Sequence, residues 1–417
     1  MKFIADFHLH SKYSRATSRD MDLENLDKWA RIKGIKILGS GDFTHPEWLK
    51  SLKEKLEPAE SGLFKLRNGS QIRFILTSEI SCVYSKGNKA RKIHVIIFAP
   101  SFEMVEKINT HLGWIGNLKS DGRPILGLDA KELAKIVLEI SEDCLIVPAH
   151  LMTPWFSLFG SKSGFDSVEE CFGEYSKYIY AGETGLSASP DMLWRMPDGR
   201  RITLISNSDA HSPAKLGREA NIFEGSELTY RSIISAIKRQ GVANLKLIST
   251  IEFFPQEGKY HYDGHRLCGI SFSPQESKKT GNICPNCGKP LTIGVLNRVD
   301  ELADKPEGFR PENALPFKNL VPLEEIIADA LGVMSGTKQT ESEYKTLIDK
   351  FGPEFNVLLE ASRPELDLVT LPEIAEGVIR VREGRVYVEP GYDGVYGKIK
   401  IFSEGEQKTI SKQKTLF

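Results

Sequence analysis

Short apolar segments alternate with amphipathic helical patterns from Met1 to about Ile251, and this alternation strongly restricts the possible folds. Helical patterns occupy 22–33, which ends at Gly34, a residue suited to the left-handed position after a helix, and also 130–140 and 232–239. Repetition of strand and helix at this length favours a parallel α/β fold, and a closed barrel is compatible with it. The predicted strands are 2–10, 35–40, 72–78, 93–98, 144–149, 178–182, 202–206 and 245–249.

The chain changes character after Phe254. Residues 257–292 are rich in Gly, Pro, Lys and Cys. They are too few to fold without a stabilising cross-link such as a bound metal ion. Helices are predicted at 323–331 and 341–351, a hairpin is predicted where 378–388 alternates, and the polar residues from 404 onward are expected to be frayed. We therefore predict four parts: an α/β barrel at 1–252, a zinc-ribbon-like module at 253–300, a helical domain at 301–376, and a β-hairpin with a frayed tail at 377–417.

Charge and apolar content narrow the classes of function. The 55 basic and 56 acidic residues give a net charge of −1, so any contact with a polyanion must come from local basic patches. The longest apolar runs have the length of strands, which argues against a membrane partner. Asp6 stands where a secretory signal needs apolar residues, so a cytoplasmic protein is expected. Cys82, Cys144 and Cys171 are isolated and are predicted to be small core residues.

Histidines and acids recur where the predicted strands end. His8 and His10 close the first strand, where alternate residues share a face, so two imidazoles project the same way. His94 is the exception because it opens its strand. If 80–93 formed a hairpin-like excursion, His94 would return beside Glu79, which could then bridge two ions. The other residues of this set are Asp42, His45, His150, Glu183, Asp209 and His211.

Any one of these residues could be a helix cap or a core residue, but ligand-type side chains at six successive strand ends indicate a shared site. Imidazole combined with carboxylate suits Zn²⁺, Mn²⁺ or Fe²⁺ better than Mg²⁺ or Ca²⁺. Two or three ions about 3.5–4 Å apart would activate a water and neutralise the charge of a phosphate. The pattern predicts phosphoester hydrolysis by two or three Zn²⁺, with Mn²⁺ or Mg²⁺ as substitutes, and Asp209, His211 and Glu79 as the catalytic candidates.

A second group of ligand-type residues predicts one structural Zn²⁺. His265 and Cys268 are followed, after fifteen residues, by Cys284 and Cys287 in a Cys-Pro-Asn-Cys-Gly motif. Paired two-residue gaps let each pair hold one tetrahedral ion from a tight turn. His261 is the alternative to His265. Zinc ribbons often contact nucleic acid, but many only stabilise the fold. This module is therefore weak evidence that the ligand is DNA or RNA.

Two further segments bear on the substrate. Lys86, Lys89 and Arg91 cluster between Glu79 and His94 and could hold phosphates, although a solvated surface turn is an equal alternative. Trp155 and Phe156 lie in an aromatic segment soon after His150. They could stack on or wedge beside an extruded base, or pack against a neighbouring domain.

The His-x-His-Ser motif at 8–11, Gly-Asp-x-x-His at 41–45 and Ser-Asp-Ala-His at 208–211, with Glu79, His94 and His150, resemble the motifs of the polymerase and histidinol phosphatase (PHP) superfamily. The resemblance implies a distorted (β/α)7 barrel with up to three metals. Many members have another His a few residues after His-x-His, where this chain has Tyr13, Ser14 and Arg15, so Asp42, Glu183 or a phosphate could complete the third site. By resemblance the first ion is held by His8, His10, Glu79 and Asp209, the second by Glu79, His94 and His150, and the third by His45 and His211.

The whole chain is also similar to the endonuclease Q family. The matching stretches are Gly-Asp-Phe-Thr-His-Pro-Glu-Trp at 41–48, Ala-Gly-Glu-Thr-Gly-Leu-Ser at 181–187, Tyr-His-Tyr-Asp-Gly-His-Arg at 260–266 and Pro-Gly-Tyr-Asp-Gly-Val-Tyr-Gly at 390–397. The resemblance implies a DNA-repair endonuclease that nicks double-stranded DNA 5′ to a deaminated base (hypoxanthine, uracil or xanthine) or an abasic site. It also implies base flipping into a pocket beside the metals, where Ser187 and Asn207 are candidates to read the base.

For such an enzyme we expect a nucleoid-associated location. Whether a sliding clamp is a partner stays an open question. Three other functions also stay open. They are a small-molecule phosphatase of the histidinol-phosphate type, a nucleic-acid exonuclease, and a zinc-ribbon DNA-binding protein with a vestigial barrel.

For a repair endonuclease, a pocket that pairs with the carbonyl created by deamination would distinguish a deaminated base from a normal one. A normal base would leave buried polar groups of the pocket unpaired.

Overall fold

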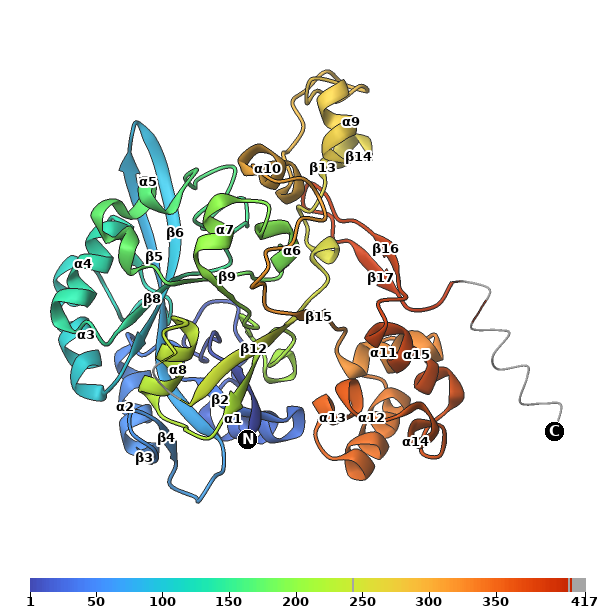
Figure 1. Ribbon diagram of the computed structural model, residues 1–417, viewed down its shortest axis with the longest axis horizontal. Helices are drawn as coiled ribbons and strands as arrows, with labels where there is room; N and C mark the ends of the chain where they lie inside the picture. Colours follow the sequence, from blue (N-terminus) through green and yellow to red (C-terminus); the bar gives the residue numbers. More distant parts are fainter. Residues whose placement is uncertain (242–243, 404–405, 407–417) are drawn as a thin grey trace.

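The computed structural model describes residues 1–241, 244–403 and 406, and it has three parts (Figure 1). A large α/β part is followed by a small part around β13, β14 and α9, and then by a group of helices and a short pair of strands. Apart from 406, the end that was expected to be frayed lies outside the described residues. No helix in the described ranges is both long and apolar enough to cross a bilayer.

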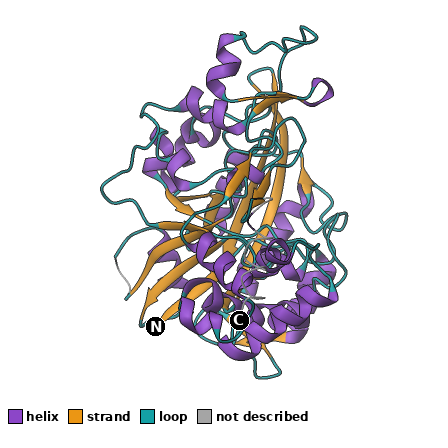
Figure 2. Cartoon of the chain, turned by 90° about the vertical axis from the view of Figure 1, so that its right-hand side faces the viewer, coloured by secondary structure: helices purple, strands orange, loops and turns teal. Residues whose placement is uncertain are grey.

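Among the described residues, eleven strands form one mixed sheet in the order β15-β12-β11-β1-β2-β5-β4-β3, with β6 and β7 paired to β5 and β8 paired to β6. The strands gather at the centre of the large part with helices around them (Figure 2). The strands of this sheet are β1 (Lys2–Asp6), β2 (Ile35–Gly39), β3 (Leu56–Pro58), β4 (Phe64–Leu66), β5 (Arg73–Lys86), β6 (Lys89–Ala99), β7 (Ile125–Leu126), β8 (Leu145–Pro148), β11 (Ala220–Gly225), β12 (Leu245–Glu252) and β15 (Phe317–Asn319).

The sheet is only partly parallel, which corrects the expectation of a parallel fold. Strands β1, β2 and β5 are parallel, but β11 runs antiparallel to β1, and β6 runs antiparallel to both β5 and β8. The reversal between β5 and β6 is made by Gly87 and Asn88, whose φ angles of 59° and 58° suit a two-residue hairpin turn. The expected excursion over 80–93 is therefore a long hairpin with no crossover helix.

The expected closed barrel is not present as a continuous ladder of hydrogen bonds within the described ranges. Strands β9 (Ala181–Glu183) and β10 (Thr203–Ile205) form a separate parallel pair. The N–H of Leu151 donates to the carbonyl of Glu183 at 2.9 Å, and the N–H of His10 donates to the carbonyl of Ala210 at 3.0 Å. These hydrogen bonds bring the ends of β1, β8, β9 and β10 together, and the candidate site lies there.

The helices of the large part follow local sequence signals. Helix α1 begins after Asp22, whose carboxylate accepts the Asn25 N–H, and ends at Gly34 with φ 89°. Its buried Leu23, Leu26 and Ala30 lie on one face. The helices are α1 (Leu23–Lys33), α2 (Pro46–Lys55), α3 (Phe102–Ile115), α4 (Ala130–Ile140), α5 (Val168–Phe172), α6 (Pro190–Leu193), α7 (Pro197–Arg201) and α8 (Tyr230–Ile237).

The small part contains β13 (Asp263–His265), β14 (Ile270–Phe272), α9 (Pro274–Lys279) and α10 (Val295–Leu302). The turn-rich stretch 390–397 packs against it, because the Tyr262 N–H donates to Gly391 at 2.9 Å and the Gly391 N–H donates to Gln256 at 2.8 Å. The strand pair β16 (Tyr387–Glu389) and β17 (Lys398–Lys400) flanks this stretch. The C-terminal strands are therefore attached to the small part as well as to the helices.

The predicted hairpin at 378–388 is wrong at its start, since 372–382 form a helix, and only 387–388 of this stretch belong to a strand. Pro372 occupies a first-turn position, and Ile374, Val378 and Val381 are buried at helical spacing. The expected boundary between 376 and 377 falls inside this helix. The helices after α10 are α11 (Leu323–Leu331), α12 (Lys338–Phe351), α13 (Glu354–Leu359), α14 (Arg363–Asp367) and α15 (Pro372–Arg382).

The helical part packs against the large part through α13 and α1. The buried ammonium of Lys33 lies 2.7 Å from the carboxylate of Glu354. A Cβ on Gly34 would lie 2.8 Å from the side chain of Pro353, so this contact needs a glycine. The close approach fixes where the helices sit beside the sheet.

Candidate active site

Three buried side-chain atoms converge where β1 and β10 end. The Nε2 atoms of His8 and His10 and Oδ1 of Asp209 have no hydrogen-bond partner among the described residues. His10 Nε2 lies 3.2 Å and His8 Nε2 3.7 Å from Asp209 Oδ1. Buried polar atoms without partners are rare and costly unless a ligand satisfies them. This donor set fits a cation, and the three residues form one of the groups able to hold a metal ion.

Glu79, near the middle of β5, lies between this cluster and a second one. Its Oε2 lies 3.5 Å from His8 Nε2 and 3.2 Å from His10 Nε2. Its Oε1 lies 2.8 Å from His94 Nδ1 and 3.2 Å from His150 Nε2. Glu79, His94 and His150 form another group able to hold a metal ion. One carboxylate is thus shared by two clusters, as the bridging hypothesis requires.

The β5–β6 hairpin brings His94 to this position, because its register pairs Ser81 with His94. Burial lowers the pKa of His94 to about 4, so its imidazole is neutral near pH 7. For Glu79, burial alone would raise the pKa, but His94, Arg123 and His8 together hold it well below its usual range. A neutral imidazole and an ionised carboxylate are the forms that bind metals.

Asp42 and Glu183, both predicted as ligands, lie behind the two imidazoles of β1. His10 Nδ1 lies 3.0 Å from Asp42 Oδ1, and His8 Nδ1 lies 3.0 Å from Glu183 Oε1. Asp42 also accepts the Ser11 N–H at 2.6 Å. A carboxylate in this position fixes the tautomer and the orientation of a metal-binding imidazole. The geometry thus directs the Nε2 atoms of both histidines into the cluster.

Of the two histidines assigned to a third ion, His45 packs on Tyr13, whereas His211 lies against the first cluster. His45 stacks on Tyr13 with ring centroids 4.5 Å apart. His211 stacks on His10 at 4.6 Å, and its Nε2 lies 3.6 Å from Asp209 Oδ1. The metal-holding groups found in the described part of the chain include neither His45 nor His211. A third ion at this pair stays a prediction.

Arg123 is a residue of the site that sequence reasoning missed. Its guanidinium donates to Glu79 Oε2 at 3.0 Å, and its backbone N–H donates to the Asp121 carboxylate at 3.1 Å. The Arg123 side chain is 27% exposed, so it lies at the edge of the buried cluster. It belongs to the loop before β7 and follows no predicted strand end, so the pattern that revealed the other residues contained no signal for it.

The basic cluster expected to hold phosphates is largely used within the chain. The Lys86 ammonium donates to the carbonyl of Cys171 at 3.0 Å. The Arg91 guanidinium is buried 3.9 Å from the ring centroid of Phe165 and donates to the carbonyl of Gly164. Only Lys89, at the hairpin tip, is exposed. Lys86 and Arg91 therefore attach the β5–β6 hairpin to 164–171, and their contact with a phosphate stays a prediction.

The aromatic pair is divided between two environments. The Phe156 ring lies 4.8 Å from that of His94, so Phe156 packs beside the second cluster. Trp155 is 38% exposed and meets the ring of Tyr260 edge-on at 5.4 Å. Trp155 is therefore accessible to a ligand, whereas Phe156 supports the site from within.

The two candidate base-reading residues also differ. Ser187 is half-buried in the loop after β9. Asn207 is fully buried, and its carbonyl oxygen accepts the Phe7 N–H at 2.9 Å and the Asn221 amide at 2.9 Å. Its amide donates to Glu183 Oε1 at 2.9 Å. The Asn207 side chain thus links the residue that follows β1 to Glu183 at the end of β9. Its oxygen and its amide nitrogen are both engaged within the protein and do not face a base.

Replacing Asn207 by alanine is therefore expected to lower stability. The substitution leaves the Phe7 N–H and one Glu183 interaction unpaired in the interior, at a cost of about 1–3 kcal/mol for each group. The free energy of unfolding from urea titration measures this loss. Ser187→Ala, at a half-buried position, is the control. Unchanged stability together with altered lesion preference would instead favour a base-reading role for Asn207.

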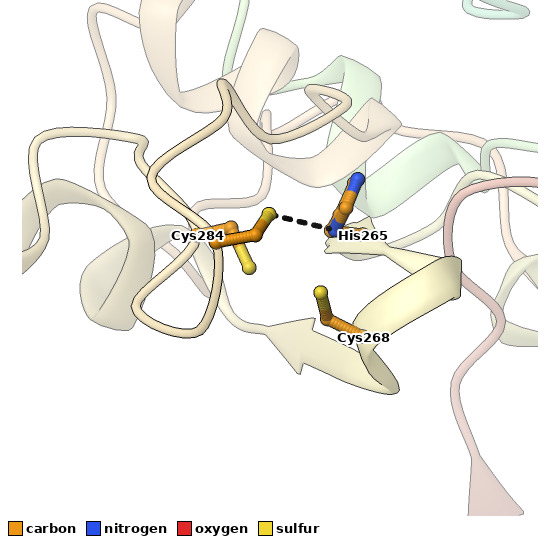
Figure 3. A group of neighbouring side chains, drawn as sticks. His265, Cys268 and Cys284 are labelled. Carbon is orange, nitrogen blue, oxygen red and sulfur yellow. Dashed lines mark hydrogen bonds between the residues drawn. The ribbon is translucent and has the colours of Figure 1, made fainter.

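The cysteine-rich segment forms a third group of ligand-type atoms. His265, Cys268, Cys284 and Cys287 each offer an atom within 4.8 Å of the others. Figure 3 shows His265, Cys268 and Cys284 pointing toward one another from β13, the turn after it and the loop beyond. His261 is not in this group, and its ring stacks on Tyr262 at 5.5 Å. The geometry selects His265 over His261, and three thiols with one imidazole fit a tetrahedral Zn²⁺.

A family model described as the MJ0043 C-terminal domain matches residues 322–385. The uncharacterized protein MJ0043 of Methanocaldococcus jannaschii is 36% identical over 277 residues, which are 63% of this chain and 33% of that protein, so the chain matches about a third of that relative's length. The uncharacterized protein YqxK of Bacillus subtilis is 30% identical over 419 residues, covering 96% of this chain and 99% of that protein.

The two ligand clusters and the Glu79 carboxylate that they share define the class of this protein, a metal-dependent hydrolase. The crystal structure of a lesion-specific endonuclease from Pyrococcus furiosus, PfuEndoQ, matches with a TM-score of 0.86 and 32% identity over 100% of both chains. Endonuclease Q in complex with a 27-mer duplex carrying an abasic lesion at the active site matches with a TM-score of 0.85 and 33% identity, over 97% of this chain and 98% of that one. This chain belongs to the endonuclease Q family.

Proposed function

We propose that this protein is a DNA-repair endonuclease that hydrolyses the phosphodiester bond 5′ to a deaminated base or an abasic site in duplex DNA. The observation that carries the proposal is the pair of ligand clusters that share Glu79. Full-length similarity to an endonuclease Q bound to an abasic duplex supports the choice of substrate over a small phosphate.

The residues fit two divalent cations in the two clusters. The first would be held by His8, His10 and Asp209, and the second by His94 and His150, with Glu79 between them. Bound there, the cations would lower the pKa of a water and neutralise the charge that develops on the phosphate. The imidazole-rich set favours Zn²⁺, with Mn²⁺ or Mg²⁺ as substitutes.

The protein's own residues orient and shield this centre. Asp42 and Glu183 accept from the Nδ1 atoms of His10 and His8, which holds both rings in one orientation. Arg123 places a guanidinium beside Glu79 at the edge of the cluster, and its planar fork suits a phosphate oxygen. Arg123 would therefore hold the DNA backbone next to the cations.

Recognition of the damaged base would fall mainly to Ser187. Its half-buried hydroxyl can donate to the carbonyl that deamination creates, whereas the Asn207 amide is already engaged with Glu183. Trp155 is the exposed aromatic side chain available to stack beside an extruded base. Asn207 would act indirectly, by holding the carboxylate that orients His8. The described residues offer no support for a sliding-clamp partner, which stays a prediction.

A cleavage panel tests the proposal. Duplexes with one deoxyinosine, one deoxyuridine or one abasic site should each give a single nick 5′ to the lesion, at a rate about 10³-fold or more above that of the undamaged duplex. Products are sized on a sequencing gel with Zn²⁺, Mn²⁺ or Mg²⁺ added. Uncut lesion DNA with metal bound would refute the lesion specificity. Turnover of an aryl phosphate without nicking would identify a small-molecule phosphatase, and mononucleotide products would identify an exonuclease.

A further inference from the structure

The segment 151–166, called here the aromatic loop, packs against the second ligand cluster. The carbonyl of Phe156 accepts the His94 N–H at 3.1 Å, and the Phe156 ring lies 4.8 Å from the imidazole. The loop is folded on itself, since the Phe159 N–H donates to Leu151 at 2.9 Å and the Phe165 N–H donates to Leu158 at 2.7 Å. The position of Phe156 beside His94 therefore depends on how the whole loop is held.

Arg298 of α10 holds this loop from the outside. Its Nε donates to the carbonyl of Phe159 at 3.0 Å, and its Nη2 donates to the carbonyl of Phe165 at 3.2 Å and to the carboxylate of Asp166. The residue is 7% exposed, and its Nη1 lies 2.8 Å from Glu301. A buried guanidinium that satisfies two carbonyls 6 residues apart acts as a clamp, because its planar donors fix both positions together.

Helix α10 is in turn attached to the zinc-ligand hairpin. The Asp263 carboxylate accepts the Gly294 N–H and the Asn297 amide, both at 2.6 Å. Asp263 begins β13, the strand that ends at the zinc-ligand candidate His265. These contacts form a continuous path from the cysteine cluster through α10 to the aromatic loop.

A second, independent contact joins the same two parts. The Val295 N–H donates to the carbonyl of Tyr260 at 2.7 Å, and the ring of Tyr260 meets that of Trp155 edge-on. The exposed tip of the aromatic loop therefore rests on the segment that leads into β13. Both Trp155 and the loop carbonyls are supported by residues that follow the α/β part in sequence.

We infer that Arg298 is a positioning residue that fixes the aromatic loop over the metal-ligand cluster, so that the zinc-bearing module builds part of the catalytic pocket. The inference rests on the proposed function for its effect on nicking, but its structural part stands on the contacts alone. Arg298 belongs to none of the ligand clusters, and it acts through the loop that places Phe156 beside His94.

The test compares Arg298→Met and Arg298→Lys with Lys278→Met, which removes an exposed cation of the same module that forms an ion pair with Asp300. Because two buried carbonyls lose their donors, hydrogen exchange of amides in 151–166 should rise by about 10-fold or more in Arg298→Met. Arg298→Lys should fall between wild type and Arg298→Met, since a point charge cannot span both carbonyls. Zinc content should stay at the wild-type level.

Nicking of an abasic duplex provides the second readout. In Arg298→Met we expect kcat to fall by about 10-fold or more while the Kd for the duplex changes less than about 2-fold, the split expected of a positioning residue. Unchanged exchange in 151–166 would overturn the inference whatever the activity. If Arg298→Met does not fold, Arg298→Lys decides by the same exchange measurement. A wild-type protein that nicks nothing would refute the proposed function and leave the exchange test intact.

Discussion

Asp209→Asn is expected to reduce nicking of lesion-bearing DNA by about 10³-fold or more. Oδ1 of Asp209 faces His10 Nε2 at 3.2 Å and is one of the three unpartnered buried atoms of the first cluster. An amide has the same shape but lacks the negative charge, so the site would bind a divalent cation much more weakly. Asp209 is ionised, because although burial alone would raise its pKa, His8 and His10 hold it well below its usual range.

Single-turnover nicking of an abasic duplex measures this effect, together with metal analysis of the purified protein. Asp349→Asn is the matched control, since Asp349 is exposed on α12 of the helical part, outside both ligand clusters, and it should nick at the wild-type rate. If Asp209→Asn nicked normally, the first cluster could not be the catalytic metal site. Loss of folding would be recognised by circular dichroism and would call for Asp209→Glu in its place.

Cys284→Ser is expected to remove one zinc per chain and unfold the module around β13 and β14, while the cations of the α/β part stay bound. The stretch from 263 to 292 buries few apolar side chains, Cys284 and Leu291 among them, so it has no hydrophobic core of its own. Zinc binding to such sites contributes about 10–16 kcal/mol, which here is folding free energy. Losing one thiolate from a four-ligand site removes most of it.

Metal analysis and hydrogen exchange of 263–292 measure this prediction. Cys144→Ser is the matched control, because Cys144 is an isolated core cysteine at 2% exposure, and its zinc content should be that of the wild type. A full zinc complement in Cys284→Ser, or unchanged exchange in the module, would contradict a structural zinc site at these residues.

Several elements followed from sequence alone because their signals are local. Helix α4 occupies Ala130–Ile140 and helix α11 occupies Leu323–Leu331, the ranges predicted from the sequence. The placement of His94 beside Glu79 followed from one inference about a hairpin, which the Gly87–Asn88 turn makes. The cysteine spacing likewise brought four ligand-type residues together.

Other features depended on contacts between residues distant in sequence. The alternation at 378–388 suggested a hairpin, but burial of Ile374 and Val378 against the other helices favours α15. The sequence left Lys86 and Arg91 open between phosphate binding and a solvated turn, and contacts with the segment at 164–171 engage both side chains. Propensity and charge specify what a residue can do, and the neighbours that tertiary packing supplies decide which of those roles it takes.

The amino-acid sequence by itself determined which ligand-type side chains this protein has and that His8, His10 and His150 follow the end of a strand. Glu79 and His94 were predicted at strand boundaries but lie within β5 and β6. Only the tertiary structure decided that Asp42 and Glu183 lie behind the imidazoles, that Asn207 is locked inside, and that Arg123 joins Glu79. The physical reason is that strand ends are encoded by local periodicity and turn residues. The face of an imidazole that meets a carboxylate, in contrast, is set by partners up to 175 residues away.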